Sequence, residues 1–136
     1  MIIHSLWRRF LRKSANEPQK AMTLVEAQRE FALDVSYLIQ YIFKSGYTCT
    51  FGDAYRSPKA FGGQGEKGPY GENRSSHKQR LAVDLNLFKD GKYLMNTEDH
   101  KPIGKHWKTL HPDNRWGGDF SNPDGNHYSK RYGGIA

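Results

Sequence analysis

The sequence has 136 residues, of which 36% are hydrophobic and 13% aromatic, with 21 lysines and arginines against 14 aspartates and glutamates. This length suits one domain with a modest core. The net charge of +7 suits a polyanionic partner such as nucleic acid, anionic lipid or another acidic polymer. The single cysteine, Cys49, excludes an internal disulfide framework and a cysteine-rich zinc knuckle. No apolar run approaches the roughly 20 residues that span a bilayer, which excludes an integral membrane protein.

Residues 1–21 form a basic segment in which apolar side chains recur at helical spacing between arginines. No uninterrupted apolar stretch follows the start, so we predict no secretory signal and expect synthesis in the cytoplasm. Three interpretations of this arm stay open: a loosely docked terminus, a contact with an anionic membrane or wall surface, and a start-site artefact with natural translation from Met22. We therefore expect the single domain to cover residues 22–136.

The next segment predicts a long core helix. Thr23 and Glu26 fit a capping box at its start, and Gly46 suits a residue just past its end. Between them one apolar stripe recurs at steps of three and four residues. Its members are Leu24, Ala27, Phe31, Val35, Leu38, Ile39 and Ile42.

Strands and loops dominate the rest of the chain. Alternating patterns predict strands within 47–56 and over 81–88, where Asp90-Gly91 forms a hairpin turn to a partner strand at 92–95. The glycine-rich segment 61–73 is predicted to be a long loop, and Pro102 to open a short helix that ends near Leu110. Short extended pieces are expected at 115–120 and 126–130, joined by a turn at 122–125. This order indicates an α+β fold with an antiparallel sheet.

Asp84 lies in the middle of an apolar strand, where an unpaired carboxylate is costly to bury. It therefore requires a cation, which is either a metal or an arginine such as Arg56 or Arg80. Two histidines are placed to complete a metal site: His77 precedes the strand, and His127 opens the last extended piece. Two imidazoles and a carboxylate are a typical catalytic zinc set with one position left for water.

Asp124 lies three residues before His127, across the predicted turn, so both side chains can face one cavity. A carboxylate that is not used as a ligand can act as the general base for an attacking water. The spacing alone leaves a second interpretation open, in which Asp84 pairs with an arginine and the histidines are surface residues.

A pattern of Ser-x-His followed by six residues and Asp, with Asp-x-x-His far downstream, resembles the bacterial and phage cell-wall metallopeptidases. These include D-alanyl-D-alanine carboxypeptidases, D,D-dipeptidases and phage L-alanyl-D-glutamate endopeptidases. The resemblance runs from Met22 through most of the chain, in three segments that occur in the family's order: 22–57, 75–94 and 106–129. It implies the Hedgehog/D,D-peptidase-like fold, a small antiparallel sheet packed against a long N-terminal helix, with a zinc site in a cleft on the sheet.

The resemblance also implies roles for individual residues. His77, Asp84 and His127 resemble the ligands of one zinc ion, and Asp124 resembles the catalytic carboxylate. The remaining implied roles are Arg56 for stabilising the carbonyl oxygen as it gains charge, Ser75 for contacting substrate and Trp116 for one wall of the substrate cleft. The chain departs from many family members at Arg80, where they carry glycine.

The implied activity is zinc-dependent hydrolysis of peptidoglycan stem peptides, with the phage branch favouring an L-alanyl-D-glutamate endopeptidase that acts as an endolysin. A D-alanyl-D-alanine carboxypeptidase or dipeptidase and a non-catalytic wall-binding module remain alternatives. We expect a monomer that reaches the wall through a separate pore. Nucleic acid is not expected as a partner, because the basic residues are spread along the chain and no recognition motif is present.

Overall fold

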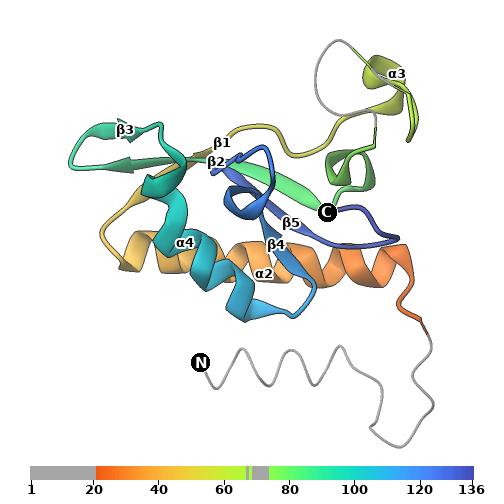
Figure 1. Cartoon of the computed structure of the whole chain (residues 1–136). Helices are drawn as coiled ribbons and strands as arrows, with labels where there is room; N and C mark the ends of the chain where they lie inside the picture. Colours follow the sequence, from red (N-terminus) through yellow and green to blue (C-terminus); the bar gives the residue numbers. More distant parts are fainter. Residues whose placement is uncertain (1–20, 67, 69–73) are drawn as a thin grey trace, which may run out of the picture.

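The computed structural model describes residues 21–66, 68 and 74–136. Residues 1–20 of the predicted arm lie outside this description, so the interpretations of the arm stay predictions. The helices are α2 (Leu24–Lys44), α3 (Pro58–Phe61) and α4 (Thr97–Leu110), with short 3₁₀ turns η1 (Ser76–Gln79) and η2 (Gly117–Asp119) (Figure 1). The strands are β1 (Thr48–Phe51), β2 (Ala82–Lys89), β3 (Lys92–Leu94), β4 (Asn114–Trp116) and β5 (His127–Lys130). None of these helices is long and apolar enough to cross a membrane.

The long core helix predicted from the capping box is confirmed as α2. The Thr23 hydroxyl accepts a hydrogen bond from the Glu26 backbone N–H at 3.2 Å, and the Glu26 carboxylate accepts one from Thr23 N–H at 3.4 Å. These bonds satisfy two of the backbone donors that a helix start leaves without an intrahelical partner. The apolar stripe then faces inward, with Ala27, Leu38 and Ile42 fully buried.

The sheet is antiparallel, with strand order β1-β2-β5-β4 and β3 paired to the end of β2. β2 is the central strand. Its residues Val83, Leu85 and Leu87, together with Leu81 just before it, are almost completely buried. They pack toward α2 and α4, which lie together against one face of the sheet (Figure 1). The predicted α+β fold is thereby confirmed, and the opposite face of β2 carries the polar side chains of Asp84 and Asn86.

Aromatic side chains fill the space between the two helices and the sheet. Phe31 of α2 meets Trp107 of α4 edge to face, with ring centroids 5.6 Å apart. The Trp107 indole N–H donates to the carbonyl oxygens of Arg115 and Ser129, at 2.9 and 3.0 Å. Trp107 therefore joins α4 to both β4 and β5 while its ring remains in the core.

Two elements differ from the sequence-based expectation. α4 begins at Thr97 rather than at Pro102, which lies inside the helix. The Asp99 carboxylate accepts a hydrogen bond from Asn96 N–H at 3.2 Å, so this acidic residue caps the helix start upstream of the proline. The predicted extended piece at 115–120 is a strand only up to Trp116 and continues as η2.

A buried charged cluster ties α2 to the far end of the sheet. The Glu30 carboxylate lies 2.8 Å from His111 Nε2 and 3.3 Å from Lys130 Nζ, and all three side chains are buried. Asp113 N–H donates to His111 Nδ1 at 3.0 Å, so a neutral His111 carries its proton on Nε2, toward Glu30. The hydrogen bond from His111 and the charge of Lys130 lower the pKa of Glu30 to about 2, although burial opposes this shift.

We expect Glu30→Gln to lower the free energy of unfolding by roughly 3 kcal/mol at pH 7, because Lys130 would lose its buried carboxylate partner. The depressed pKa of Glu30 means that this contribution is complete above its usual value of 4.5 and is lost as the pH falls toward about 2. Urea unfolding at pH 7 and pH 3 should therefore show a wild-type advantage that narrows in acid. Glu98→Gln, on a side chain that is 82% exposed, is the matched control and should change stability little. An equal effect of both variants would contradict this account.

Candidate metal centre

The open face of the sheet brings two of the predicted ligands together. Asp84 and His127 are direct partners in the pairing of β2 with β5. Their neighbours Val83 and Tyr128 point into the core, so by strand alternation Asp84 and His127 project from the opposite face. The cross-strand register alone is therefore sufficient to place an imidazole beside the carboxylate.

His77 reaches the same point from η1, just before β2. Ser75 caps this turn by accepting a hydrogen bond from His77 N–H at 3.2 Å. The His77 Nδ1 lies 3.0 Å from the carbonyl oxygen of Ala54, which can only accept, so Nδ1 carries the proton. In the neutral ring Nε2 then has a free lone pair, and it faces Asp84. A backbone carbonyl behind an imidazole is the usual way to orient a metal-ligating histidine.

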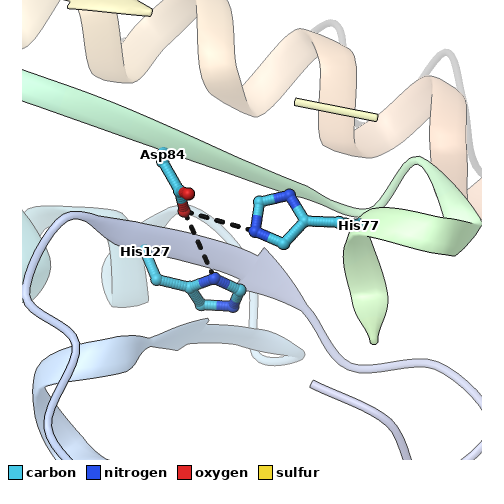
Figure 2. A group of neighbouring side chains, drawn as sticks. All are labelled: His77, Asp84 and His127. Carbon is cyan, nitrogen blue, oxygen red and sulfur yellow. Dashed lines mark ion pairs between the residues drawn. The ribbon is translucent and has the colours of Figure 1, made fainter. Parts of the chain in front are cut away.

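The three side chains converge from three segments of the chain (Figure 2). Asp84 Oδ1 lies 3.2 Å from His77 Nε2 and 3.5 Å from His127 Nδ1. Within the described residues Oδ1 is nevertheless buried without a hydrogen bond. One ligand atom from each residue lies within 4.8 Å of the others, a group that could hold a metal ion. Two imidazole nitrogens and a carboxylate oxygen fit zinc in donor type.

The electrostatics of Asp84 favour the ionised carboxylate. Burial raises the pKa of Asp84, but the neighbouring His127 and His77 lower it more, to about 2. The structure does not support the alternative prediction that Asp84 pairs with Arg56 or Arg80. Arg56 pairs with Asp53 at 3.6 Å, and the Arg80 guanidinium lies over the Tyr55 ring, 4.1 Å from its centroid.

Arg80 has a backbone conformation that is unusual for a residue with a side chain. It ends η1 in the left-handed region, with φ 58° and ψ 34°. Only glycine adopts this region without a steric penalty, which explains why glycine suits this position in the family that the sequence resembles. Here the contact between Arg80 and Tyr55 offsets part of that cost.

A cavity of about 620 Å³ opens over the two imidazoles. Three of the four other residues predicted to act in catalysis or at the substrate cleft also line it: Asp124, Arg56 and Ser75. Asp124 is exposed in the turn before β5, and its backbone N–H donates to Gly117 O at 2.9 Å. A Cβ added at Gly117 would lie only 2.1 Å from the Asp124 carbonyl oxygen, so glycine permits this close approach.

Arg56 and Ser75 form one wall of this cavity. Arg56 Nη1 donates to Ser75 Oγ at 3.1 Å, and Arg56 N–H donates to the His77 carbonyl at 3.3 Å. The guanidinium is therefore attached to the same turn that carries His77. A fixed cation in this position can stabilise negative charge that develops on an oxygen within the cavity.

Trp116 lies elsewhere than expected. Its side chain is 4% exposed, belongs to the hydrophobic core and is not among the residues that line the cavity. The indole N–H donates to Gly125 O at 2.7 Å, and the ring lies so close to Gly104 that a side chain there would collide with it. The indole needs a buried acceptor, and by finding one in Gly125 it supports the turn that carries Asp124.

Two contributors to the site carry no clear signal in the sequence. The Ala54 carbonyl that orients His77 is a backbone group, which any residue would supply. Asp53 pairs with Arg56 three residues later, a spacing that is common in loops and predicts nothing by itself. Both follow β1 directly, so they could have been found only from the pairing of β1 with β2.

Comparison with known proteins gives a family-model match and a similar fold. A family model described as D-alanyl-D-alanine carboxypeptidase matches residues 70–130, which include the three clustered ligands, Ser75 and Asp124. The structure is similar to that of the Serratia marcescens L-Ala D-Glu endopeptidase ChiX, with a TM-score of 0.51, 16% sequence identity, and coverage of 87% of this chain and 96% of that chain. At this identity the likeness shows the fold. No curated protein matches the sequence.

We expect His77→Ala and Asp84→Asn each to lower zinc affinity at least tenfold, because each removes one of only three protein ligands. Metal analysis after dialysis and calorimetric titration of the metal-free protein would measure the loss. His106→Ala is the matched control, since His106 stacks on Tyr41 away from the cluster and should leave zinc binding intact. Full zinc affinity in both ligand variants would contradict the assignment.

A second prediction concerns the left-handed residue. Arg80→Ala keeps the strained backbone and loses the contact with Tyr55, whereas Arg80→Gly loses the contact and relieves the strain. We expect the alanine variant to be less stable than the glycine variant by about 1 kcal/mol. Thermal or urea unfolding of the two variants side by side measures the difference. Equal free energies of unfolding would contradict the prediction, because they would show that the left-handed conformation does not destabilise the protein at this position.

Proposed function

We propose that this protein hydrolyses peptidoglycan stem peptides in a zinc-dependent reaction, a proposal supported by the match of residues 70–130 to the D-alanyl-D-alanine carboxypeptidase family model. The observation that carries the proposal is that four side chains line one cavity and a fifth, Asp84, lies against the two histidines among them. His77 and His127 line the cavity above Asp84, and Asp124 and Arg56 line it beside them. A purely structural metal site would require neither Asp124, a candidate base, nor Arg56, a fixed cation.

In this proposal His77, Asp84 and His127 hold the zinc ion. A zinc ion bound there would supply a Lewis acid at the floor of the cavity. The Asp124 carboxylate takes a proton from the attacking water and delivers it to the leaving nitrogen, since it is exposed to the cavity and is not one of the clustered ligands. The Arg56 guanidinium stabilises the carbonyl oxygen as it gains negative charge. Ser75 holds Arg56 in place and faces the substrate.

We favour an L-alanyl-D-glutamate endopeptidase that acts as a phage or prophage endolysin. The fold shared with an L-Ala D-Glu endopeptidase and the motif pattern of the phage branch support this choice. The description of the matched family favours the alternative, a D-alanyl-D-alanine carboxypeptidase. A non-catalytic wall-binding module is less well supported, because it would not explain why Asp124 and Arg56 line the same cavity as the two histidines.

We expect Asp124→Asn to lower the rate of muropeptide cleavage about 100-fold or more, because the amide cannot accept the proton of the attacking water. Zinc content should stay at the wild-type level, since Asp124 is not one of the clustered ligands. The matched control is Asp119→Asn, on an exposed residue that pairs with Lys108 outside the cavity. Wild-type cleavage by the Asp124 variant would refute its role as the base.

A further inference from the structure

The turn that follows α3 is attached to the segment that carries Ser75 and His77. The Gln64 side chain lies along the backbone of Ser75 and bonds with both of its polar groups. Gln64 Nε2 donates to Ser75 O at 2.8 Å, and Ser75 N–H donates to Gln64 Oε1 at 2.9 Å. One side-chain amide thus pairs with Ser75 as a neighbouring strand would.

A second side chain makes the reciprocal connection. Lys78, which is buried, donates from Nζ to the carbonyl oxygens of Gly63, at 3.0 Å, and Glu66. These two carbonyls belong to the turn that Gln64 occupies, which is itself closed by a bond from Glu66 N–H to Gly63 O at 3.0 Å. We call the paired contacts of Gln64 and Lys78 the clasp.

The clasp contacts Ser75, the residue whose hydroxyl accepts a hydrogen bond from Arg56 in the cavity wall. Ser75 Oγ accepts from Arg56 Nη1 at 3.1 Å and from His77 N–H at 3.2 Å. Because Gln64 bonds with both backbone groups of Ser75, it limits how far this residue can shift or rotate. Ser75 Oγ is thereby one anchor of the Arg56 guanidinium, another being the Asp53 carboxylate at 3.6 Å.

We propose that Gln64 is a positioning residue that acts on Arg56 through Ser75; this inference rests on the proposed function. Arg56 is a long side chain with several rotatable bonds, and stabilisation of a developing oxyanion depends steeply on donor placement. Gln64 is exposed and does not line the cavity, so its truncation leaves no core cavity and removes no group from the reaction. Its effect must therefore pass through the residues that it contacts.

The test combines Gln64→Ala, Arg56→Ala and the double variant with a soluble muropeptide as substrate. We expect Gln64→Ala to lower kcat about tenfold with unchanged zinc content, and to cause no further loss in the Arg56→Ala background. The matched control is Gln40→Ala, on another exposed glutamine at a distant position in α2, which should leave kcat unchanged. A general structural role would instead lower activity by the same factor in both backgrounds.

Amide hydrogen exchange supplies a readout that does not depend on activity. Ser75 N–H should exchange about tenfold faster in Gln64→Ala than in the wild type, whereas its rate in Gln40→Ala should be unchanged. Unchanged exchange, unchanged kcat, loss of zinc from the variant, or equal losses in both backgrounds would each overturn the proposal. If the wild type cleaves no muropeptide while Ser75 exchange responds as expected, the proposed function has failed. The positioning role of Gln64 in catalysis then fails with it, although its contact with Ser75 is confirmed.

Discussion

The structure depends on one constraint: a carboxylate is placed in the middle of the central strand. The register of β2 and β5 puts His127 opposite Asp84, and η1 brings His77 to the same oxygen. The carboxylate oxygen is buried without a hydrogen bond within the described part of the chain. Burial without a partner is costly for such an oxygen, whereas a cation shared with two imidazoles offsets the cost. The same arrangement that would resolve this energetic problem is the group that could hold a metal ion.

The two faces of the sheet have different roles. The helices cover one face, where Trp107 and the buried Glu30 cluster join α2, α4 and the strands. The other face is free for chemistry, and the turns around it are held by contacts with their backbone groups. Gly117 lets the Asp124 backbone approach closely, Trp116 bonds to Gly125, and Gln64 bonds to Ser75. Support for the site thus comes largely from residues that never reach the cavity.

Local patterns were sufficient to predict the elements that depend on local physics. The capping box at Thr23, the alternation in β2 and the hairpin turn at Asp90-Gly91 are confirmed. The three clustered side chains, His77, Asp84 and His127, could be selected as candidate ligands from their residue types and from the motifs in which they occur. The start of α4 was harder to predict because two local signals compete. Pro102 suggested a helix start, but Asp99 caps the helix upstream of it. Contacts across the fold could not be predicted, because the Ala54 carbonyl, the burial of Trp116 and the Gln64 contact are properties of tertiary pairing rather than of sequence spacing.

The most direct test is digestion of purified peptidoglycan by the protein as purified, after chelation, and after zinc is added back, with the new termini identified by mass spectrometry. We expect new N-terminal D-glutamate residues that vanish with chelation and return with zinc. Release of free D-alanine under the same control would keep the zinc centre and move the substrate to the carboxypeptidase alternative. Absence of cleavage by the zinc-loaded protein, or cleavage that persists after complete metal removal, would contradict the central claim.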